Sequence, residues 1–256
     1  MSWSPSQYVK FEEERNRPIR DLLARIAGGP AARAVDVGCG PGNSTELLRR
    51  HFPDADIVGI DSSPDMIEAA RKRLPGVRFE IEDIAAWRSS GPFDVILANA
   101  SLQWVPDHAA LLPALVARLA PGGRLAVQIP DNLDEPAHVL MRETAAAGPW
   151  ASKLADASRA REVRRGADWY YRALRDAGAR ADVWLTVYHH PLRGGCGDIV
   201  EFFKSTGLRP FLQPLGEGER ADFLARYRAA LAGAYPEMPD GTVLLPFPRL
   251  FFVAIR

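Results

Sequence analysis

Short apolar runs alternate with amphipathic segments through the first half of the chain. The apolar runs have the length and composition of buried strands and lie at 34–37, 57–60, 77–81, 93–98 and 124–129. The segments with helical spacing lie at 17–27, 44–51, 64–73 and 107–119, and Pro121-Gly122-Gly123 predicts a turn before the last of these strands. This alternation is typical of an α/β protein with a Rossmann-like, doubly wound parallel sheet.

The second half of the chain has a different pattern. Helices are expected at 136–147 and 168–177, and the polar stretch 150–165 between them predicts either a loop-rich cap element or a mobile segment. Strands are expected at 181–188 and 250–255, with helices at 198–206 and 217–232 between them. An excursion of roughly 60 residues is too long for a plain connection, so it predicts a helical lid inserted between the last two strands. Such a lid would lie over the carboxyl ends of the strands, where these sheets bind ligands.

The first strand ends in a glycine-rich turn. The run from Val35 to Glu46 reads VDVGCGPGNSTE, with Gly38, Gly40 and Gly42 in G-x-G-x-G spacing. Glycine lets a ligand approach the backbone, and the helix that follows presents free N–H groups. Asp36, two residues before the first glycine, and the tight spacing both favour S-adenosylmethionine over NAD. We therefore expect Asp36 and the three glycines to bind the cofactor.

Polar residues also follow the next three strands. Asp61 and Ser62 end the second strand, and a carboxylate there can accept hydrogen bonds from both hydroxyls of a ribose; the alternative is a solvated cap. After the third strand, Asp83 can accept from an adenine amine while Ile84 packs on the ring, or Asp83 can cap a helix. Asn99 follows the fourth strand, where it would meet the amino-acid part of the cofactor or form a simple turn. Together these positions predict one adenosyl pocket.

Composition limits the classes of function. The 256 residues can bury one large core, and 32 basic residues balance 32 acidic ones, so we expect no nucleic-acid partner and no membrane partner. No apolar run reaches the roughly 18 residues of a membrane span, and residues 1–10 do not resemble a signal peptide. The chain has two cysteines, Cys39 and Cys196, and Cys39 lies inside the glycine loop, so we expect no disulfide framework, which favours the cytoplasm. We expect a monomer.

The motifs resemble those of the class I S-adenosylmethionine-dependent methyltransferases. The matching residues are Val35–Gly42, Val58–Pro64 (VGIDSSP) and Asp83. The resemblance implies a seven-stranded sheet whose last strand is antiparallel and lies between strands five and six.

A closer resemblance, to the trans-aconitate 2-methyltransferase family, extends over nearly the whole chain. It is carried by six stretches: 3–11, 15–18, 99–108, 128–132, 206–210 and 247–251. It is weakest at 150–165 and 193–197. The resemblance implies one methyltransferase domain that makes a monomethyl ester of trans-aconitate, a small tricarboxylate, and releases S-adenosylhomocysteine. Its parts would be an N-terminal arm (1–30), a cofactor-binding core (31–132), cap or lid segments (133–166 and 190–247) and the last strand (249–255).

A carboxylate acceptor sets simple chemical requirements. It is already ionised at neutral pH, so methyl transfer needs positioning and a dry site rather than a general base, and we expect no catalytic acid or base. Binding three carboxylates requires guanidinium groups. The candidates are Arg15, Arg17, Arg209 and Arg249, of which Arg249 and then Arg17 are preferred from their neighbouring residues. For each, the alternative is a solvated surface charge.

Aromatic residues complete the expected site. Trp3 and Tyr8 belong to an aromatic arm at the N-terminus, which either folds over the cofactor and the substrate or anchors a helix. Trp104 would form a wall of the substrate pocket; the alternative is packing in the core. His108 is expected to start a helix, and His189, His190 and Cys196 lack further suitably spaced ligands, so no metal is expected.

Three alternatives stay open on the sequence alone. The first is a methyltransferase of the same fold that acts on another small molecule. The second is a binding module for an adenosyl ligand without catalysis, which the large lid disfavours. The third is an NAD-linked oxidoreductase, which the glycine spacing disfavours.

Overall fold

A computed structural model describes residues 11–26, 28–88, 91–159, 165–204 and 206–256. The chain forms two compact units. The first comprises Met1–Pro130, Arg165–Thr186 and Leu250–Arg256, and the second comprises Asp131–Arg164 and Val187–Arg249. None of the helices within the described ranges combines the length and the hydropathy needed to span a bilayer.

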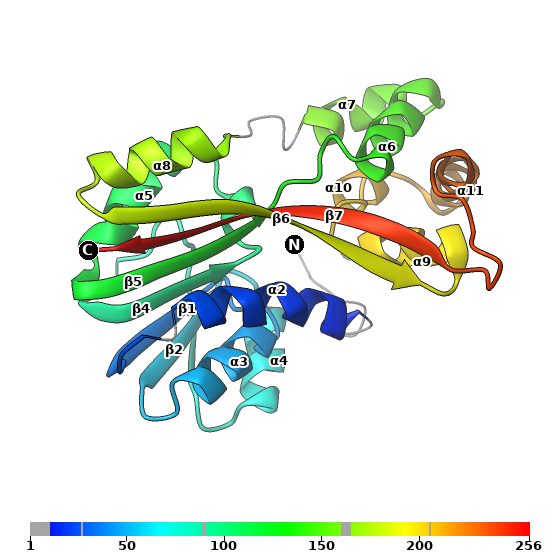
Figure 1. The fold of residues 1–256 in the computed structure, drawn as a ribbon. Helices are drawn as coiled ribbons and strands as arrows, with labels where there is room; N and C mark the ends of the chain where they lie inside the picture. Colours follow the sequence, from blue (N-terminus) through cyan, green and yellow to red (C-terminus); the bar gives the residue numbers. More distant parts are fainter. Residues whose placement is uncertain (1–10, 27, 89–90, 160–164, 205) are drawn as a thin grey trace. The chain divides into compact units, whose positions relative to one another are not determined.

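A seven-stranded sheet has the strand order β3-β2-β1-β4-β5-β7-β6. The strands are β1 (Arg33–Val37), β2 (Asp56–Asp61), β3 (Arg78–Ile81), β4 (Phe93–Asn99), β5 (Leu119–Pro130), β6 (Arg180–Leu192) and β7 (Val243–Ile255). The pairs β1–β2, β1–β4, β2–β3 and β4–β5 are parallel. This order confirms the predicted doubly wound sheet, which Figure 1 shows as a ribbon.

The last strand runs antiparallel to β5. The Gly122 N–H donates to the Arg256 carbonyl oxygen at 2.8 Å, and the Arg256 N–H donates to the Gly123 oxygen at 3.1 Å. At the other end of β5, the Asp131 N–H donates to the Pro248 oxygen at 2.9 Å. The start of β5 therefore lies beside the end of β7, and β7 is inserted between β5 and β6 as predicted.

The turn predicted at Pro121-Gly122-Gly123 is a local irregularity inside a strand and not the boundary before one. These residues lie inside β5, which begins at Leu119. The pairing with β4 shifts between Phe93–Leu119 and Val95–Arg124, so the strand takes up the extra residues as an irregularity rather than reversing. Gly122 has φ +78°, a conformation that glycine adopts without strain.

Helices cover both faces of the sheet in the first unit. They are α2 (Glu12–Arg25), α3 (Asn43–His51), α4 (Pro64–Arg73), α5 (His108–Ala117) and α8 (Ala167–Asp176), with a 3₁₀ turn at Leu102–Trp104. Figure 1 shows α5 and α8 on one face and α2, α3 and α4 on the other. α2 begins five residues earlier than predicted: three glutamates favour its N-terminus, and Pro18 lies within it.

The second unit is helical, apart from the ends of β6 and β7. Its helices are α6 (Pro136–Ala147), α7 (Ala151–Arg159), α9 (Gly195–Lys204), α10 (Arg209–Leu212) and α11 (Glu217–Ala234). The expectation of a loop-rich or mobile 150–165 is wrong for residues 151–159, which form α7; Leu154 and the preceding Trp150 are fully buried, and Trp150 packs edge-on against Phe223. The short α10 was not predicted.

Candidate active site

The glycine loop after β1 lies close to two other parts of the first unit. The N–H groups of Gly38 and Cys39 donate to the Ile60 oxygen at 2.8 and 2.9 Å. Gly38 has φ +78°, and a Cβ atom built on it would lie 2.3 Å from the Ser101 Cβ. Only glycine fits at this position, because any side chain would overlap the segment that follows β4.

A cavity of about 470 Å³ opens beside this loop. Its wall comes from the loop and from the carboxyl ends of β2, β3 and β4, all within the first unit. The lining residues are Gly38, Cys39, Gly40, Asn43, Ser44, Asp61, Ser62, Ser63, Met66, Asp83, Ile84, Asn99, Ala100, Ser101, Trp104 and Val105. Seven of the ten residues expected to bind the cofactor are therefore brought together at one place: Gly38, Gly40, Asp61, Ser62, Asp83, Ile84 and Asn99.

Asp61 has a structural role as well as a place in the wall. One carboxylate oxygen accepts from the Gly40 N–H at 3.0 Å, and the other accepts from the Ser63 N–H at 2.8 Å. Burial raises the pKa of Asp61, and these two backbone donors oppose the rise. The carboxylate thus fixes the glycine loop relative to the end of β2, and each oxygen keeps lone-pair capacity for a ligand.

Asp83 makes a local capping bond and also lines the cavity. Its Oδ1 accepts from the Ala85 N–H at 2.9 Å, which is the local cap foreseen as the alternative. Asp83 and Ile84 nevertheless line the cavity. The capping bond occupies only one carboxylate oxygen, so the other is available to an exocyclic amine.

Two buried polar atoms at the cavity make no hydrogen bond within the part of the chain that the structure describes. They are Asn99 Oδ1 and Ser63 Oγ. Buried acceptors and hydroxyls are seldom left without partners, so each suits a polar ligand atom. The neighbouring Ala100 has φ +51°, a left-handed conformation that is unusual for a residue with a side chain.

Asp36 lies beneath the loop instead of in the cavity wall. It is fully buried, and its Oδ2 accepts from the Ser44 and Thr45 hydroxyls, each at 2.6 Å. Burial raises the pKa of Asp36 to about 6, although both hydroxyls act in the opposite direction. Gly42 is also outside the wall; with φ +89° it packs against Ala70 of α4. The structure therefore gives both residues a supporting place under the glycine loop and α3.

The residues expected to bind the substrate are distributed over both units. Trp104 lines the cavity and is 41% exposed. Trp3 and Tyr8 lie outside the described residues. On α2, Arg17 is exposed whereas Arg15 is buried, the reverse of the preference drawn from sequence.

Arg209 and Arg249 lie in the second unit. Arg249 is only 4% exposed, and its guanidinium lies 4.5 Å from the centre of the Phe247 ring. Arg209 begins α10 and is half-buried, which lowers its pKa. Partial desolvation of both guanidiniums is what a site for carboxylates requires, because a charge pair strengthens as water is excluded.

Sequence reasoning missed several wall residues as ligands. Cys39, Met66 and Val105 have no side chain typical of a polar ligand contact, and Asn43 and Ser44 belong to the start of α3, after the glycine loop. His108 was expected to start a helix, and it does. Its ring nitrogens lie 2.6 Å from the Tyr170 hydroxyl and 2.7 Å from the Leu102 oxygen. Across the described ranges, no three His, Cys, Asp or Glu residues are grouped to hold a metal ion.

Comparisons with known proteins agree with this geometry. A family model described as "Methyltransferase domain" matches residues 11–182. The chain is 55% identical to the trans-aconitate 2-methyltransferase of Methylobacterium nodulans over 99% of its own length and 98% of the relative's. Identity is 52% to the enzyme of that name from Rhodopseudomonas palustris strain BisB18, with 99% of each chain covered, and 51% to that from Rhizobium meliloti, with 100% and 99% covered.

Solved structures share the fold at low sequence identity. The YcgJ protein of Bacillus subtilis superposes with a TM-score of 0.63 at 13% identity, covering 94% of this chain and 98% of that one. A phosphoethanolamine N-methyltransferase of Haemonchus contortus, solved with S-adenosyl-L-methionine, gives a TM-score of 0.55 at 16% identity over 94% and 52% of the two chains.

Proposed function

The chain belongs to the S-adenosylmethionine-dependent methyltransferases, and we propose that it converts trans-aconitate into a monomethyl ester. The observation that carries the proposal is its 50–55% identity to enzymes named for this reaction, over 97% or more of both chains. That similarity includes the second unit, where the acceptor arginines are expected, as well as the cofactor fold shared by the wider family.

The cavity suits S-adenosylmethionine on physical grounds. Its described wall contains two carboxylates, from Asp61 and Asp83, and no lysine or arginine. A pyrophosphate-bearing dinucleotide would meet only like charge from these side chains, whereas a sulfonium cation and a ribose are compatible with them. Asn99 Oδ1 offers an acceptor for the cofactor's ammonium group, and Ile84 gives the adenine an apolar surface.

The chemistry follows from positioning. When bound, S-adenosylmethionine supplies a methyl group on sulfur; an acceptor carboxylate oxygen forms the new bond as the carbon–sulfur bond breaks, with its electrons going to sulfur. The carboxylate is ionised at neutral pH, so no side chain has to remove a proton. The protein's task is to bring that oxygen into line with the methyl–sulfur bond and to exclude water.

We assign the acceptor's carboxylates to Arg249 and Arg209, with Arg17 as a further candidate. A guanidinium binds a carboxylate through two parallel N–H donors, which fixes its orientation as well as its charge. Trp104, which lines the cavity of the first unit, is a further candidate for substrate binding. From the sequence, we propose Tyr8 as a cofactor-binding residue and Trp3 as a substrate-binding residue.

The test is an acceptor panel. Purified protein is incubated with methyl-labelled S-adenosylmethionine and trans-aconitate, cis-aconitate, citrate, isocitrate or a monocarboxylate, and labelled esters are identified by mass spectrometry. We expect the highest kcat/KM with trans-aconitate. Transfer only to a different acceptor would replace the substrate assignment, and S-adenosylhomocysteine binding without turnover on any acid would overturn it.

We also propose that the enzyme acts as a monomer in the cytoplasm. Both cysteines are buried thiols, which suits a reducing compartment. Light scattering after size-exclusion chromatography tests the oligomeric state, and fractionation of the source cells tests the location.

A further inference from the structure

A buried hydrogen bond joins α2 to the wall of the cofactor cavity. The Asn43 side-chain amide donates to Asn16 Oδ1 at 2.8 Å, and the two side chains are 3% and 5% exposed. Asn43 is the first residue of α3 and lines the cavity. Asn16 lies 27 positions earlier, on a helix that contributes no side chain to the described wall.

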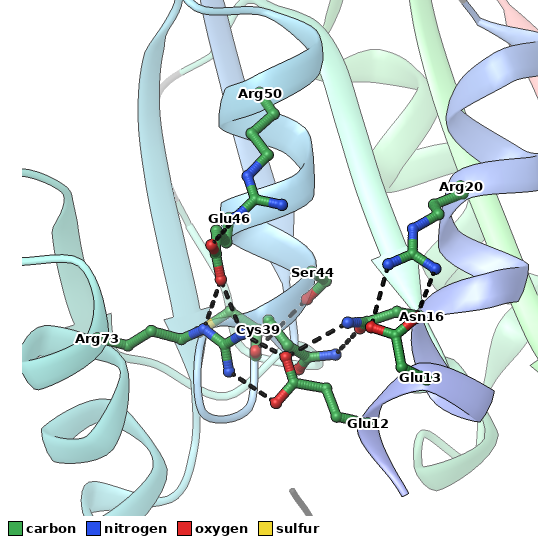
Figure 2. Close-up of polar contacts among 10 residues, drawn as sticks. Glu12, Glu13, Asn16, Arg20, Cys39, Ser44, Glu46, Arg50 and Arg73 are labelled. Atoms are coloured by element: carbon green, nitrogen blue, oxygen red, sulfur yellow. Dashed lines mark hydrogen bonds and ion pairs between the residues drawn. The ribbon is translucent and has the colours of Figure 1, made fainter.

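The contact continues into a network of ion pairs (Figure 2). The Asn16 amide nitrogen donates to Glu12 Oε1 at 3.3 Å. Arg73 of α4 binds both oxygens of Glu12, with Nη1 at 3.1 Å from Oε2, and its Nε donates to Glu46 of α3 at 2.8 Å. Arg73 lowers the pKa of Glu12, which keeps this carboxylate ionised at neutral pH.

Three helices are therefore connected through Arg73 and Asn16. α3 follows the glycine loop and α4 follows Asp61 and Ser63, so both begin at the cavity. α2 lies within the expected N-terminal arm (1–30), after the positions of Trp3 and Tyr8 in the sequence. The side chains of Glu12, Glu46 and Arg73 are only 21%, 24% and 26% exposed, so salt screens this network less than it screens a surface pair.

Packing alone does not require an amide pair here. Ile19, Leu22 and Leu23 already bury the apolar face of α2. Burying two amides opposes folding unless they are hydrogen-bonded to each other, and the benefit of such a pair is a defined orientation. Here the orientation fixed is that of Asn43, at the start of the helix that faces the cofactor.

We propose that Asn16 is a positioning residue for the cofactor: it holds Asn43 at the cavity wall and couples cofactor binding to the docking of the first turn of α2. The inference rests on the proposed function, because it takes the cavity to be the S-adenosylmethionine site. Coupling of this kind is reciprocal, so the cofactor stabilises the docked α2 by the same factor that docking strengthens cofactor binding.

The first test compares Asn16→Ala and Asn16→Leu with the control variants Glu13→Gln and Arg20→Met. Glu13 and Arg20 form an exposed pair on the same helix, outside the network. We expect the Asn16 variants to raise the Kd for S-adenosylhomocysteine, measured by calorimetry, about tenfold, and the controls to change it less than twofold. A merely structural Asn16 would lower Tm and leave the Kd of the folded protein unchanged, which would overturn the proposal.

A second pair of variants distinguishes loss of the hydrogen-bond network from simple misfolding. Asn16→Asp keeps the acceptor for Asn43 but places a carboxylate against Glu12, so it should also weaken binding. Adding Glu12→Gln restores a donor toward residue 16 and an acceptor toward Arg73. We expect the double variant to regain most of the affinity; a Kd no better than that of Asn16→Asp counts against the network.

Hydrogen exchange measures directly whether cofactor binding stabilises the docked α2. In the unaltered protein, S-adenosylhomocysteine should slow exchange at residues 12–20, and in Asn16→Leu this slowing should be lost while slowing around Asp61 persists. If the unaltered protein does not bind S-adenosylhomocysteine at all, the proposed function fails. If it binds and the Asn16 variants bind equally well, only the present inference fails.

Discussion

Asp36 is a carboxylate that supports the glycine loop and α3 from a fully buried position outside the cavity wall. Two hydroxyls from the first turn of α3 donate to one of its oxygens, and the residue is fully buried. The other oxygen makes no hydrogen bond to any residue that the structure describes. Burial therefore disfavours the ionised form of Asp36, and the two hydroxyl donors offset only part of this effect.

The stability of the protein should depend on pH through Asp36. The ordinary pKa of an aspartate is 3.8, whereas that of Asp36 in the folded protein is about 6. Between these two pH values the folded state therefore binds one more proton than the unfolded state. Stability contributed by this group is therefore greatest at low pH and falls as pH rises toward 6, by up to about 3 kcal/mol. Asp36→Asn removes the titration. In denaturant unfolding from pH 4 to pH 8, the free energy of unfolding of the variant should rise relative to that of the unaltered protein as pH increases. A difference that stays constant with pH would contradict this.

Asp61 should affect both binding and folding. Removing its carboxylate in Asp61→Ala deletes the expected ribose contact and also leaves the Gly40 and Ser63 N–H groups without their acceptor. We expect the Kd for S-adenosylhomocysteine to rise at least tenfold and the free energy of unfolding to fall by about 1–3 kcal/mol. Asp65→Ala, at an exposed position in the first turn of α4, is the matched control. Calorimetry and urea unfolding separate the two effects.

Arg249 should govern the acceptor and not the cofactor. Lysine retains the charge but lacks the planar fork, so Arg249→Lys should raise the KM for trans-aconitate at least tenfold and leave the Kd for S-adenosylhomocysteine within twofold. Arg193→Lys, exposed in the same unit, should change neither. An unaltered acceptor KM in Arg249→Lys would remove this residue from the acceptor site.

At the scale of elements, the loop between β1 and α3 is fixed by its contact with the segment after β4. Gly38→Ala combines a left-handed backbone with an overlap against Ser101, and should destabilise the protein by about 2–4 kcal/mol in total. Gly29→Ala has a similar φ, +92°, but nothing within 4 Å of the added methyl, so it should lose only about 1–2 kcal/mol. Equal losses in thermal unfolding would show that the overlap is relieved elsewhere.

The elements show what local pattern can and cannot predict. The bounds of strands β1 to β4 and of helices α4 and α6 lie within a residue or so of the predicted ones. In these segments the periodicity of apolar residues and the helix- or strand-breaking residues indicate the same boundaries. The turn expected at 121–123 became an irregularity inside β5, because the residues around it pair with both β4 and β7. α7 was missed because its first turns are polar and its burial depends on Phe223, about 70 positions away in sequence.

At the scale of the whole molecule, cofactor residues were easier to predict than acceptor residues. The cavity wall follows from strand order, since the ends of adjacent parallel strands meet. The buried state of Arg15 and Asn16 could not be predicted, because it depends on which face of α2 meets the sheet. The family resemblance alone predicted the acceptor. The boundaries between the two units fall inside β6 and β7, positions that the apolar pattern of these strands does not mark.

The two units should respond to different ligands. S-adenosylhomocysteine alone should slow hydrogen exchange mainly in the cavity segments 38–44, 61–66 and 99–105. Adding trans-aconitate should then slow exchange in the segments that contain Arg209 and Arg249. Mass spectrometry of peptides from both units checks the order, and no response of the second unit to the acid would place the acceptor site elsewhere.

The insertion of β7 between β5 and β6 has a consequence for synthesis on the ribosome. β5 and β6 are translated well before β7, yet each requires β7 as its neighbour in the sheet. Until β7 emerges, the nascent chain presents two strands with unpaired backbone groups, which is a known route to aggregation. A premature stop before Val243 would leave this state permanent, so such truncated products should depend on chaperones or accumulate as inclusion bodies even though their cofactor motifs are complete.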